Sequence, residues 1–502
     1  MLIMVADRLH FFNQLNPRFF NYGSLPVYIL KGATQLIDAL FFTHLSNYNG
    51  MLYVGRILSI IFDTLTIFLI YKIAKLLFNN LKIALFSSFF YAISFFPVQN
   101  SHFFTVDVFL TLFVTFLTYC LFKYLINLKK FNWKSNILLG LNFAAMMSTK
   151  FTAVIFLPII GLFLILKANK KLTSILIFII SFLIFYFLFM PYVFLEYKKF
   201  INDILLQIKM NSDSYIFPYT LQYVGTIPYF YYLKNIFLWG LGPFISIFSF
   251  FGFSIFLYKG GKLKNKKLFI FNKYILFFIF YLFYFLIIGK SAVKFMRYML
   301  PIYPFLVIMA GYGLYKVKSQ KSKVKTFKLR FLTYILLILS IVWTVAFINI
   351  YNQKHSRITA TEWILKNIPA NSTIAFEHWD DRVPLFGGEN YNYVEMTLYD
   401  LPDDQKKWSI LNDKLKQADY IVIASNRLYV PLQKLADCQK YKVCYLKTAE
   451  YYRELFNGKL GFKKTAEFSV YPKLGNWQIK DDGADESFTV YDHPKILIFK
   501  KV

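Results

Sequence analysis

Acidic residues are scarce in most of this chain, and their scarcity limits what the protein can be. Of its 27 Asp and Glu residues only seven lie before residue 352, whereas 35 of its 57 Lys and Arg residues lie there. A strongly basic protein often binds nucleic acid. Here the basic residues occupy short segments between long apolar runs, so the imbalance argues against nucleic acid as a partner and indicates a membrane protein.

Several catalytic fingerprints are absent as well. The sequence has no Walker loop, no GxGxxG, HExxH or GxSxG pattern and no CxxC pair, so ATP-driven transport and serine hydrolysis lack their usual signatures. Of the three cysteines, Cys120 lies inside an apolar run and is expected to be inert. Cys438 and Cys444 form either a disulfide, if their part of the chain is outside the cell, or two free thiols. Their spacing is unlike that of a zinc site.

Long uncharged apolar blocks, such as residues 175–190, dominate what is present, and 57% of all residues are hydrophobic. Blocks of this length are what a bilayer selects. We predict a polytopic α-helical membrane protein with ten spans in this chain, at 52–77, 82–98, 104–127, 134–149, 151–167, 172–194, 235–258, 268–289, 299–316 and 331–351.

The charges of the connecting segments alternate along the chain, which predicts the orientation of the spans. The positive-inside rule places the basic segments 72–82, 129–134, 167–171, 259–267 and 316–330 in the cytoplasm. The other connections are then outside the cytoplasmic (plasma) membrane: 94–106, the tip at Lys150, 196–233, 289–298 and the C-terminal part.

Counting the crossings also places residues 1–50 outside. They lack the basic start and the apolar run of a signal peptide, and segments 1–12 and 25–42 have the amphipathic pattern of helices on a membrane surface. We therefore expect an eleventh span upstream of Met1. The predicted division is an outward loop at 1–50, a membrane domain at 51–351 and an extracytoplasmic α/β domain at 352–502.

Helical and strand patterns alternate in the C-terminal domain, which is typical of a small open sheet. Helices are expected at 360–368, 406–417 and 450–456, and strands at 372–376, 420–425, 462–470 and 496–500.

Candidate functional residues are sought in the outward segments, where polar side chains are rare. Asp107 lies at the mouth of an apolar span, where an unpaired carboxylate is costly, and His102 precedes it by five residues. The two side chains would either share a proton, a metal or a diphosphate, or serve as a helix cap and an interfacial histidine.

Basic residues on the outer side break the charge bias. Lys150 is a lone cation at a hairpin tip, and Lys290, Lys294 and Arg297 cluster near residue 295. They would either bind a lipid phosphate through charge-assisted hydrogen bonds or anchor ordinary lipid. The turn-rich segment 16–28, which contains Asn21 and Tyr22, would hold a sugar or headgroup, or form an interfacial turn.

Several of these stretches also carry a family resemblance. The chain resembles the GT-C glycosyltransferases, which include the protein O-mannosyltransferases, the lipid A aminoarabinose transferases and bacterial relatives. The matching stretches are 16–28 (NPRFFNYGSLPVY), 56–66, 101–108 (SHFFTVDV), 148–153 (STKFTA), Pro191-Tyr192, 294–305 (KFMRYMLPIYPF), and the tail from Trp363 to the final VYDHPKILIF.

This resemblance implies inverting transfer of a sugar from a polyprenyl-phosphate carrier to an acceptor at the outer face of the membrane. In the family an Asp-Glu pair in the first outward loop supplies the catalytic base. That pair should lie about a dozen or more residues before Asn16, which is at or just before Met1. Asp7 is the only acid in that region, and the residues around it (VADRL) do not match the pair. Asp107 matches the second acidic position, and His102 is grouped with it. Lys150, Lys294, Arg297 and Tyr298, with Asn21 and Tyr22, are the expected substrate-binding residues.

The resemblance leaves the acceptor open among proteins, lipids and glycans, and a divalent metal is possible because only some relatives need one. Two other functions compete with transfer. One is non-catalytic binding of the carrier lipid, which a true absence of the Asp-Glu pair from the upstream sequence would favour. The other is transport of a lipid or sugar, which usually comes with an internal repeat that this sequence lacks.

Overall fold

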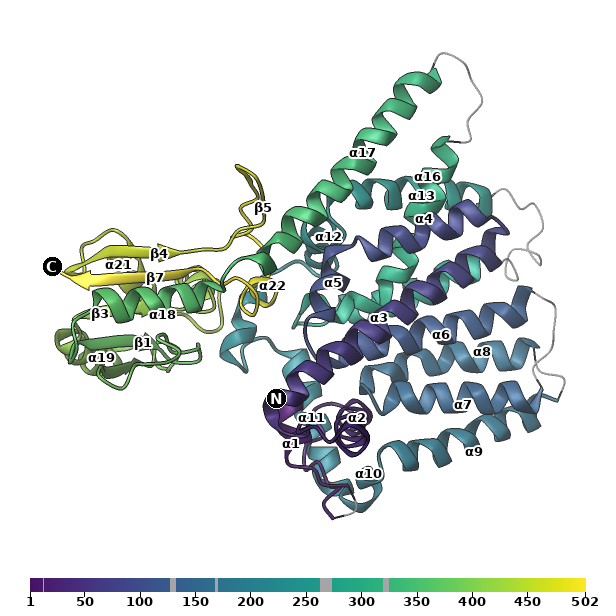
Figure 1. Cartoon of the computed structure of the whole chain (residues 1–502), viewed down its shortest axis with the longest axis horizontal. Helices are drawn as coiled ribbons and strands as arrows, with labels where there is room; N and C mark the ends of the chain where they lie inside the picture. The colour runs from purple at the N-terminus through teal and green to yellow at the C-terminus, as the bar shows by residue number, and fades with distance from the viewer. Residues whose placement is uncertain (12, 127–131, 168–169, 262–272, 319–324) are drawn as a thin grey trace. The chain divides into compact units, whose positions relative to one another are not determined.

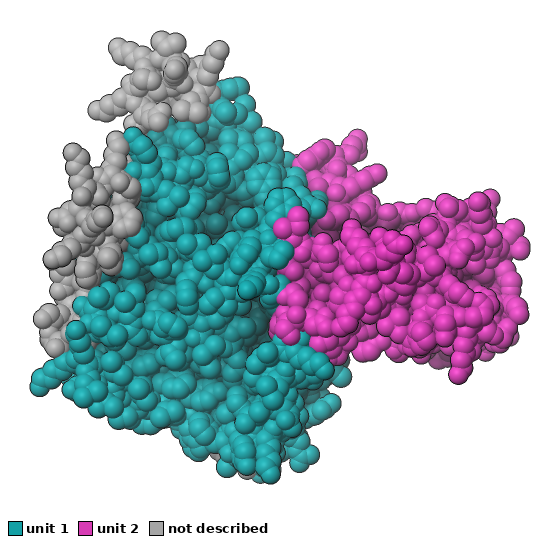
Figure 2. Space-filling model, turned by 180° about the vertical axis from the view of Figure 1, so that it is seen from behind, with its two compact units in different colours: residues 1–209, 228–291, 296–344 teal, residues 210–227, 292–295, 345–502 magenta. Residues whose placement is uncertain are grey.

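The computed structural model describes residues 1–11, 13–126, 132–167, 170–261, 273–318 and 325–502. Parts of the predicted basic segments near 130, 168, 265 and 320 lie outside the described residues. The chain forms two compact units (Figure 2). Unit 1 consists of residues 1–209, 228–291 and 296–344, and unit 2 of residues 210–227, 292–295 and 345–502.

Unit 1 is helical (Figure 1), as the apolar blocks predict. Its helices are α1 (Leu2–Asp7), α2 (Leu25–Phe41), α3 (Tyr48–Phe78), α4 (Leu81–Ala92), α5 (Phe95–Ser101), α6 (Val106–Ile126), α7 (Trp133–Met147), η1 (Phe151–Phe156), α8 (Leu157–Lys167), α9 (Lys171–Phe189), α10 (Tyr192–Leu195), α11 (Tyr197–Ser212), α12 (Phe230–Asn235), η3 (Ile236–Gly240), α13 (Pro243–Gly261), α15 (Lys273–Gly289), η4 (Met296–Ile302), α16 (Tyr303–Lys318) and α17 (Lys325–Ile348).

The predicted spans fall mainly on helices in the described chain, but those at 151–167, 235–258 and 299–316 are each divided between a short helix and a longer one. Within the described residues, five helices are long and apolar enough to cross a membrane, and the bent pair of α4 and α5 makes a sixth. Three shorter apolar helices, at 151–166, 243–258 and 273–289, accompany them. The prediction of a multi-pass helical membrane protein is confirmed.

The span predicted as continuous over 82–98 is in fact broken. Helices α4 and α5 are bent by 57° relative to each other, because the backbone at Ser94 is extended rather than helical. Asp63 of α3 bridges the two halves. Its carboxylate accepts hydrogen bonds from Tyr91 of α4 at 2.8 Å and from Ser101 of α5 at 3.0 Å. A buried acid inside a span is costly unless it is paired, so these bonds fix the bend that leads the chain into α6.

Close packing of small residues joins several of these helices. Helix α16 packs against α4 and α13, α3 against α6, and α7 against α9. At the crossing of α13 and α16, a Cβ atom on Gly252 would stand 1.9 Å from the carbonyl oxygen of Met309. Only glycine fits there, as is common where membrane helices approach closely.

Unit 2 is an α/β domain with additional short segments. Its elements are η2 (Pro218–Tyr223), η5 (Asn349–Asn352), α18 (Ser356–Asn367), β1 (Thr373–Glu377), β2 (Asn392–Met396), α19 (Gln405–Gln417), β3 (Tyr420–Ile423), α20 (Tyr429–Lys434), α21 (Leu446–Phe456), β4 (Phe462–Phe468), β5 (Lys473–Leu474), β6 (Trp477–Gln478), α22 (Glu486–Thr489) and β7 (Ile496–Lys501). The five-stranded sheet has the order β2-β1-β3-β7-β4.

The sheet of unit 2 is covered on both faces (Figure 1). Strands β1, β2 and β3 are parallel, while β7 pairs antiparallel with β3 and β4. Alternate residues of β3 enter different cores, with Ile421 and Ile423 facing α19 to α21 and Val422 facing α18. The predicted helices and strands are confirmed within a few residues. Strand β2 was not predicted, because its sequence NYVEM has no continuous apolar run.

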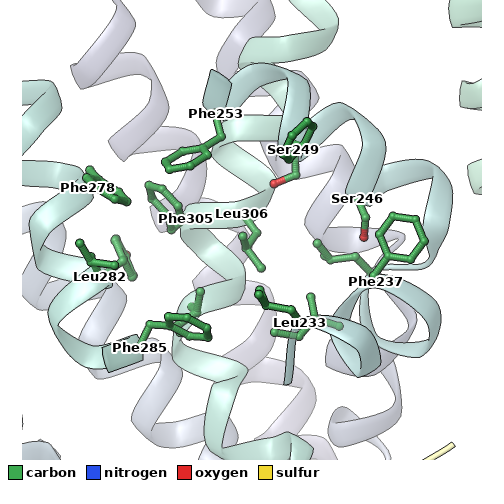
Figure 3. A pocket seen from close by; sticks show the side chains of 15 residues that line it. Leu233, Phe237, Ser246, Ser249, Phe253, Phe278, Leu282, Phe285, Phe305 and Leu306 are labelled. Atoms are coloured by element: carbon green, nitrogen blue, oxygen red, sulfur yellow. The ribbon is translucent and has the colours of Figure 1, made fainter. Parts of the chain in front are cut away.

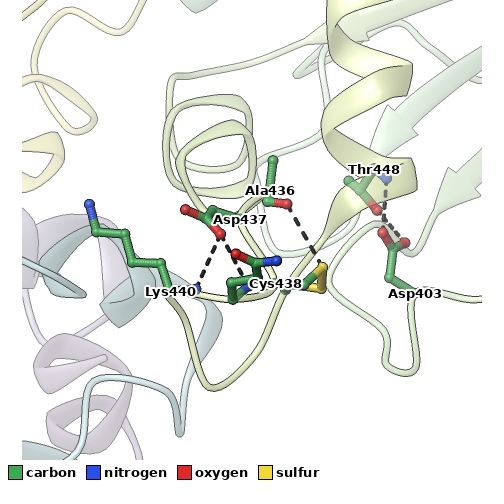
Figure 4. The surroundings of a disulfide bond; sticks show 8 residues. Asp403, Ala436, Asp437, Cys438, Lys440 and Thr448 are labelled. Atoms are coloured by element: carbon green, nitrogen blue, oxygen red, sulfur yellow. Dashed lines mark hydrogen bonds between the residues drawn. A yellow bond between two sulfur atoms is a disulfide. The ribbon is translucent and has the colours of Figure 1, made fainter.

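Cys438 and Cys444 form a disulfide bond (Figure 4). Of the two alternatives left open by the sequence, the structure contains the oxidised one. The bond closes a short loop that follows α20, and Asp437 at its base accepts hydrogen bonds from the backbone amides of Gln439 and Lys440. Cys120 is buried and free.

Glu377 at the end of β1 gives the domain a pH-dependent stability. Burial raises the pKa of this carboxyl to about 8, although Tyr452 donates a hydrogen bond to it at 2.6 Å. The folded state then keeps a proton that the unfolded state releases near pH 4.5, so stability is lost as pH rises towards 8.

We expect Glu377→Gln to raise the melting temperature of this domain at pH 9 and to flatten its pH dependence, because the amide keeps the acceptor and never ionises. At roughly 1.4 kcal/mol per pKa unit, the gain is a few kcal/mol at most. Thermal melts from pH 5 to 9 measure it, with the exposed Glu389→Gln as the control. Parallel pH profiles for the two variants would contradict the assignment.

A buried ion-pair cluster as the candidate active site

Asp107 lies in the first turn of α6, where its charge also suits the helix dipole. Only 2% of the residue is exposed. One carboxylate oxygen contacts Lys150 Nζ at 2.6 Å, and the other lies 3.7 Å from Arg297 Nε. Two cations thus share one buried carboxylate, so this cluster has an excess of positive charge. Such a cluster favours an anionic ligand.

Lys150 is held by a tight tip between α7 and η1. Its backbone is extended, and its ammonium group lies 4.1 Å from the centre of the Tyr298 ring, where a cation is attracted to the aromatic face. Tyr284 of α15 donates a hydrogen bond at 2.6 Å to the carbonyl of Tyr298. The 3-10 helix η4 therefore supplies both Arg297 and the ring beneath Lys150.

The segment with Asn21 and Tyr22 is joined to this tip by its backbone. The amides of Gly23 and Leu25 donate hydrogen bonds to the carbonyls of Thr149 and Ser148, at 3.0 and 2.9 Å. Tyr22 packs against the core formed by α1, α2, α3 and the start of α6. Asn21 lies two residues before Gly23, where segment 16–28 first contacts the tip.

Two acids that sequence reasoning did not assign hold segment 16–28 in place. Glu196 accepts a hydrogen bond from the Asn16 amide at 2.5 Å, and Asp203 accepts one from the backbone amide of Phe20 at 3.2 Å. Acids are rare before residue 352, and this rarity is the one feature of the sequence that could have marked Glu196 and Asp203 as important. Their partners lie about 180 positions away in the sequence, and the pairing could not be predicted.

His102 and Lys294 make other contacts. A ring nitrogen of His102 lies 2.9 Å from the carbonyl oxygen of Val98, at the end of α5. Lys294 belongs to unit 2, where its ammonium donates to the carbonyl of Ala292 at 2.9 Å. Of the predicted residues, the structure thus brings together Asp107, Lys150, Arg297 and Tyr298 in unit 1.

Comparisons with known proteins bear on this arrangement. Residues 39–194 match the model of the dolichyl-phosphate-mannose-protein mannosyltransferase family, a range that includes Asp107 and Lys150. The oligosaccharyltransferase of Archaeoglobus fulgidus in its apo form superposes with a TM-score of 0.51 at 12% identity, over 100% of this chain and 84% of that one. The predicted GT-C resemblance is confirmed.

The same archaeal enzyme, tethered to an acceptor peptide with the NVT sequon, gives a TM-score of 0.50 at 12% identity, with coverages of 100% and 84%. ArnT from Cupriavidus metallidurans in the apo state gives 0.41 at 10% identity, over 83% of this chain and 84% of that chain. No match was found among curated protein sequences. At 12% identity the likeness to the archaeal enzyme shows a shared fold.

Unit 1 also contains an apolar cavity of about 570 Å³ (Figure 3). It lies among η3, α13, α15 and α16, and its lining includes Tyr281, Phe285, Ile302 and Phe305. Tyr281 precedes Tyr284 by one turn of α15, and Ile302 ends the same η4 helix that carries Arg297. Two of the elements that line the cavity, α15 and η4, thus also support the ion-pair cluster, α15 through the hydrogen bond of Tyr284 and η4 through Arg297.

Within the described residues, no group of three or more His, Cys, Asp and Glu side chains is arranged to hold a metal ion. In the cluster at Asp107 the carboxylate contacts two cationic side chains.

Proposed function

We propose that this protein is a glycosyltransferase that moves a sugar from a polyprenyl-phosphate carrier to an acceptor at the outer face of the cytoplasmic membrane. The observation that carries the proposal is the buried contact of Asp107 with Lys150 and Arg297. An anionic leaving group needs preorganised positive charge where its own charge develops. The family match over 39–194 and the GT-C fold support the same reaction class.

In the proposed inverting step, an acceptor hydroxyl oxygen attacks the anomeric carbon while the bond to the carrier phosphate breaks. The phosphate oxygen leaves with the bonding electrons beside Lys150 and Arg297, and the hydroxyl proton passes to a carboxylate acting as general base. The resemblance assigns that base to an Asp-Glu pair in the first outward loop of the family. Asp107 is the second acid, which orients the two cations, and His102 stays a predicted neighbour of the reaction.

The other substrate contacts follow from the same placement. We assign Tyr298, Asn21 and Tyr22 to the sugar or the headgroup, because Tyr298 lies under Lys150 and the other two precede the segment bonded to its tip. The apolar cavity between α13, α15 and α16 suits the prenyl chain. An apolar chain in this cavity gains dispersion energy from close contact with the apolar side chains that line it.

The disulfide in unit 2 supports the proposed location of the C-terminal domain outside the cytoplasm, because disulfides persist in oxidising compartments. The archaeal oligosaccharyltransferase whose fold this chain shares has been determined with a tethered acceptor peptide. The acceptor class proposed for this chain remains a protein, lipid or glycan hydroxyl.

Incubating membranes that contain the protein with labelled polyprenyl-phosphate sugars, and following the label, tests the proposal. Transfer of label to any acceptor supports the enzyme. Saturable binding of the carrier lipid without transfer would instead establish the non-catalytic binder.

Arg297→Ala is expected to weaken carrier-lipid binding by roughly tenfold or more, because it removes a charge-assisted contact to the phosphate. The affinity of the purified protein for a labelled polyprenyl phosphate is the measurement. Lys290→Ala is the matched control, since Lys290 is an exposed cation of the same connection. Equal affinities for the two variants would remove Arg297 from the phosphate site.

A further inference from the structure

A second group of basic residues lies in unit 2, and it starts from the short segment 292–295. The amides of Ala292 and Val293 donate to the carbonyl of Asn211 at 3.0 and 3.5 Å. Phe295 packs edge-on against the Tyr223 ring of η2, with 5.4 Å between centroids. These contacts leave the Lys294 side chain only 3% exposed.

Two more lysines reach the same part of unit 2 from the region after β3. Lys434, at the end of α20, donates to the carbonyl of Val224, directly after η2. Lys440 lies in the disulfide-closed loop, with its ammonium 5.4 Å from the Tyr441 ring centre, and its side chain extends away from the disulfide (Figure 4). A Cβ atom on Gly225 would meet both Tyr441 and Lys434, which places the loop beside α20 and the end of η2.

The charges of these lysines are not balanced by acids. Among the described residues, no carboxylate forms an ion pair with any of the three, and the nearby Asp437 is engaged with backbone amides. Lys294 and Lys434 instead repel each other, as do Lys434 and Lys440. Burial and the charge of Lys434 lower the pKa of Lys294 to about 8.

A buried ammonium with a cationic neighbour is unfavourable unless an anion compensates for it. Lys294 uses one of its three N–H donors for the Ala292 carbonyl, so two remain for a ligand. We propose that Lys294, Lys434 and Lys440 form a binding site for a phosphate group, carried either by a lipid headgroup or by a soluble phosphate ester. Three ammonium groups from separate segments suit a tetrahedral oxyanion with several charged oxygens.

This site is separate from the proposed transfer reaction, because none of the three lysines belongs to the cluster at Asp107. Its test is a binding measurement, so failure of the site and failure of sugar transfer are distinguishable. Sulfate is the probe, since it resembles phosphate and keeps its charge over the tested pH range. The whole protein is used in a maltoside detergent, which carries no phosphate.

Titration calorimetry at pH 7 is expected to detect sulfate binding in the wild type. Lys434→Gln and Lys294→Met should each weaken it by roughly tenfold or more. Lys459→Gln is the control, because it removes one charge from an exposed lysine of the same domain. Absence of binding in the wild type, or the same affinity in Lys294→Met and Lys459→Gln, would overturn the proposal.

Stability and pH give two further readouts. Without anion, Lys294→Met should melt at or above the wild-type temperature, because it removes an uncompensated buried charge. A lysine with only a structural role would lower the melting temperature when replaced, and that result counts against the site. Sulfate affinity should fall as pH rises through about 8, where Lys294 loses its proton, and a flat profile from pH 7 to 9 would also contradict the site.

Competition separates the two sources of phosphate. If phosphatidylglycerol added to the detergent displaces sulfate, the natural ligand is a lipid headgroup. If glycerol 3-phosphate displaces sulfate and the lipid does not, the site takes a soluble phosphate ester. Both results support the site, whereas displacement by neither would contradict it.

Discussion

Asp107→Asn is expected to abolish measurable sugar transfer, a loss of roughly 1,000-fold, because the carboxylate orients the cations at the reacting centre. The substitution keeps the shape of the side chain but removes the only charge that the structure places between Lys150 and Arg297 among the described ion pairs. The buried Lys150 and the partly exposed Arg297 would then face each other without compensation, which costs roughly 3 kcal/mol. Label transfer in membranes and thermal melts of the purified protein measure the two effects.

A double variant separates a structural role of Asp107 from a role in the reaction. Asp107→Asn with Lys150→Met removes both partners of the 2.6 Å ion pair, so stability should recover towards the wild-type value. Transfer should stay absent, because the carboxylate is still missing. Recovery of activity together with stability would show that Asp107 only balances Lys150. The single variant Lys150→Met completes the thermodynamic cycle.

The membrane part of the fold was predictable because charge is expensive in lipid. Apolar blocks and basic connections therefore marked most of the helices to within a few residues, but not the breaks inside the predicted spans. The same cost made every remaining polar residue informative, and it singled out Asp107, Lys150 and Arg297 before their contacts were known. The family resemblance placed these residues near a phosphate. Neither the cost of charge in lipid nor the resemblance predicted that the Asp107 carboxylate contacts both cations.

What could not be predicted depends on contacts between distant segments. The bend between α4 and α5 is fixed by Asp63, which lies 28 residues before Tyr91 and 38 before Ser101. Lys294 and Arg297 are three residues apart in sequence, yet they belong to different compact units. Local patterns carry no information on such divisions, because the backbone of a short connection can turn from one packed unit to another.

The tip that carries Lys150 also depends on a distant contact, at Gly23. A Cβ atom on Gly23 would stand 1.9 Å from the carbonyl oxygen of Ser148 and 2.1 Å from its carbon. Both are backbone atoms, so no side-chain rotation can make room. Gly23 and Leu25 also supply the two amides that bind the tip.

Gly23→Ala is therefore expected to separate segment 16–28 from the tip and to displace Lys150 from Asp107. The two backbone hydrogen bonds and the overpacking together should destabilise the protein by about 3 kcal/mol or more, and transfer should fall with the loss of the ion pair. Gly32→Ala is the matched control, because its Cβ would meet only the Phe11 ring at 3.6 Å or more. A Gly23→Ala protein that melts and transfers sugar like Gly32→Ala would show that the contact with the tip does not position Lys150. A protein that melts normally but has lost transfer would place Asn21 and Tyr22, rather than the fold, at the origin of the defect.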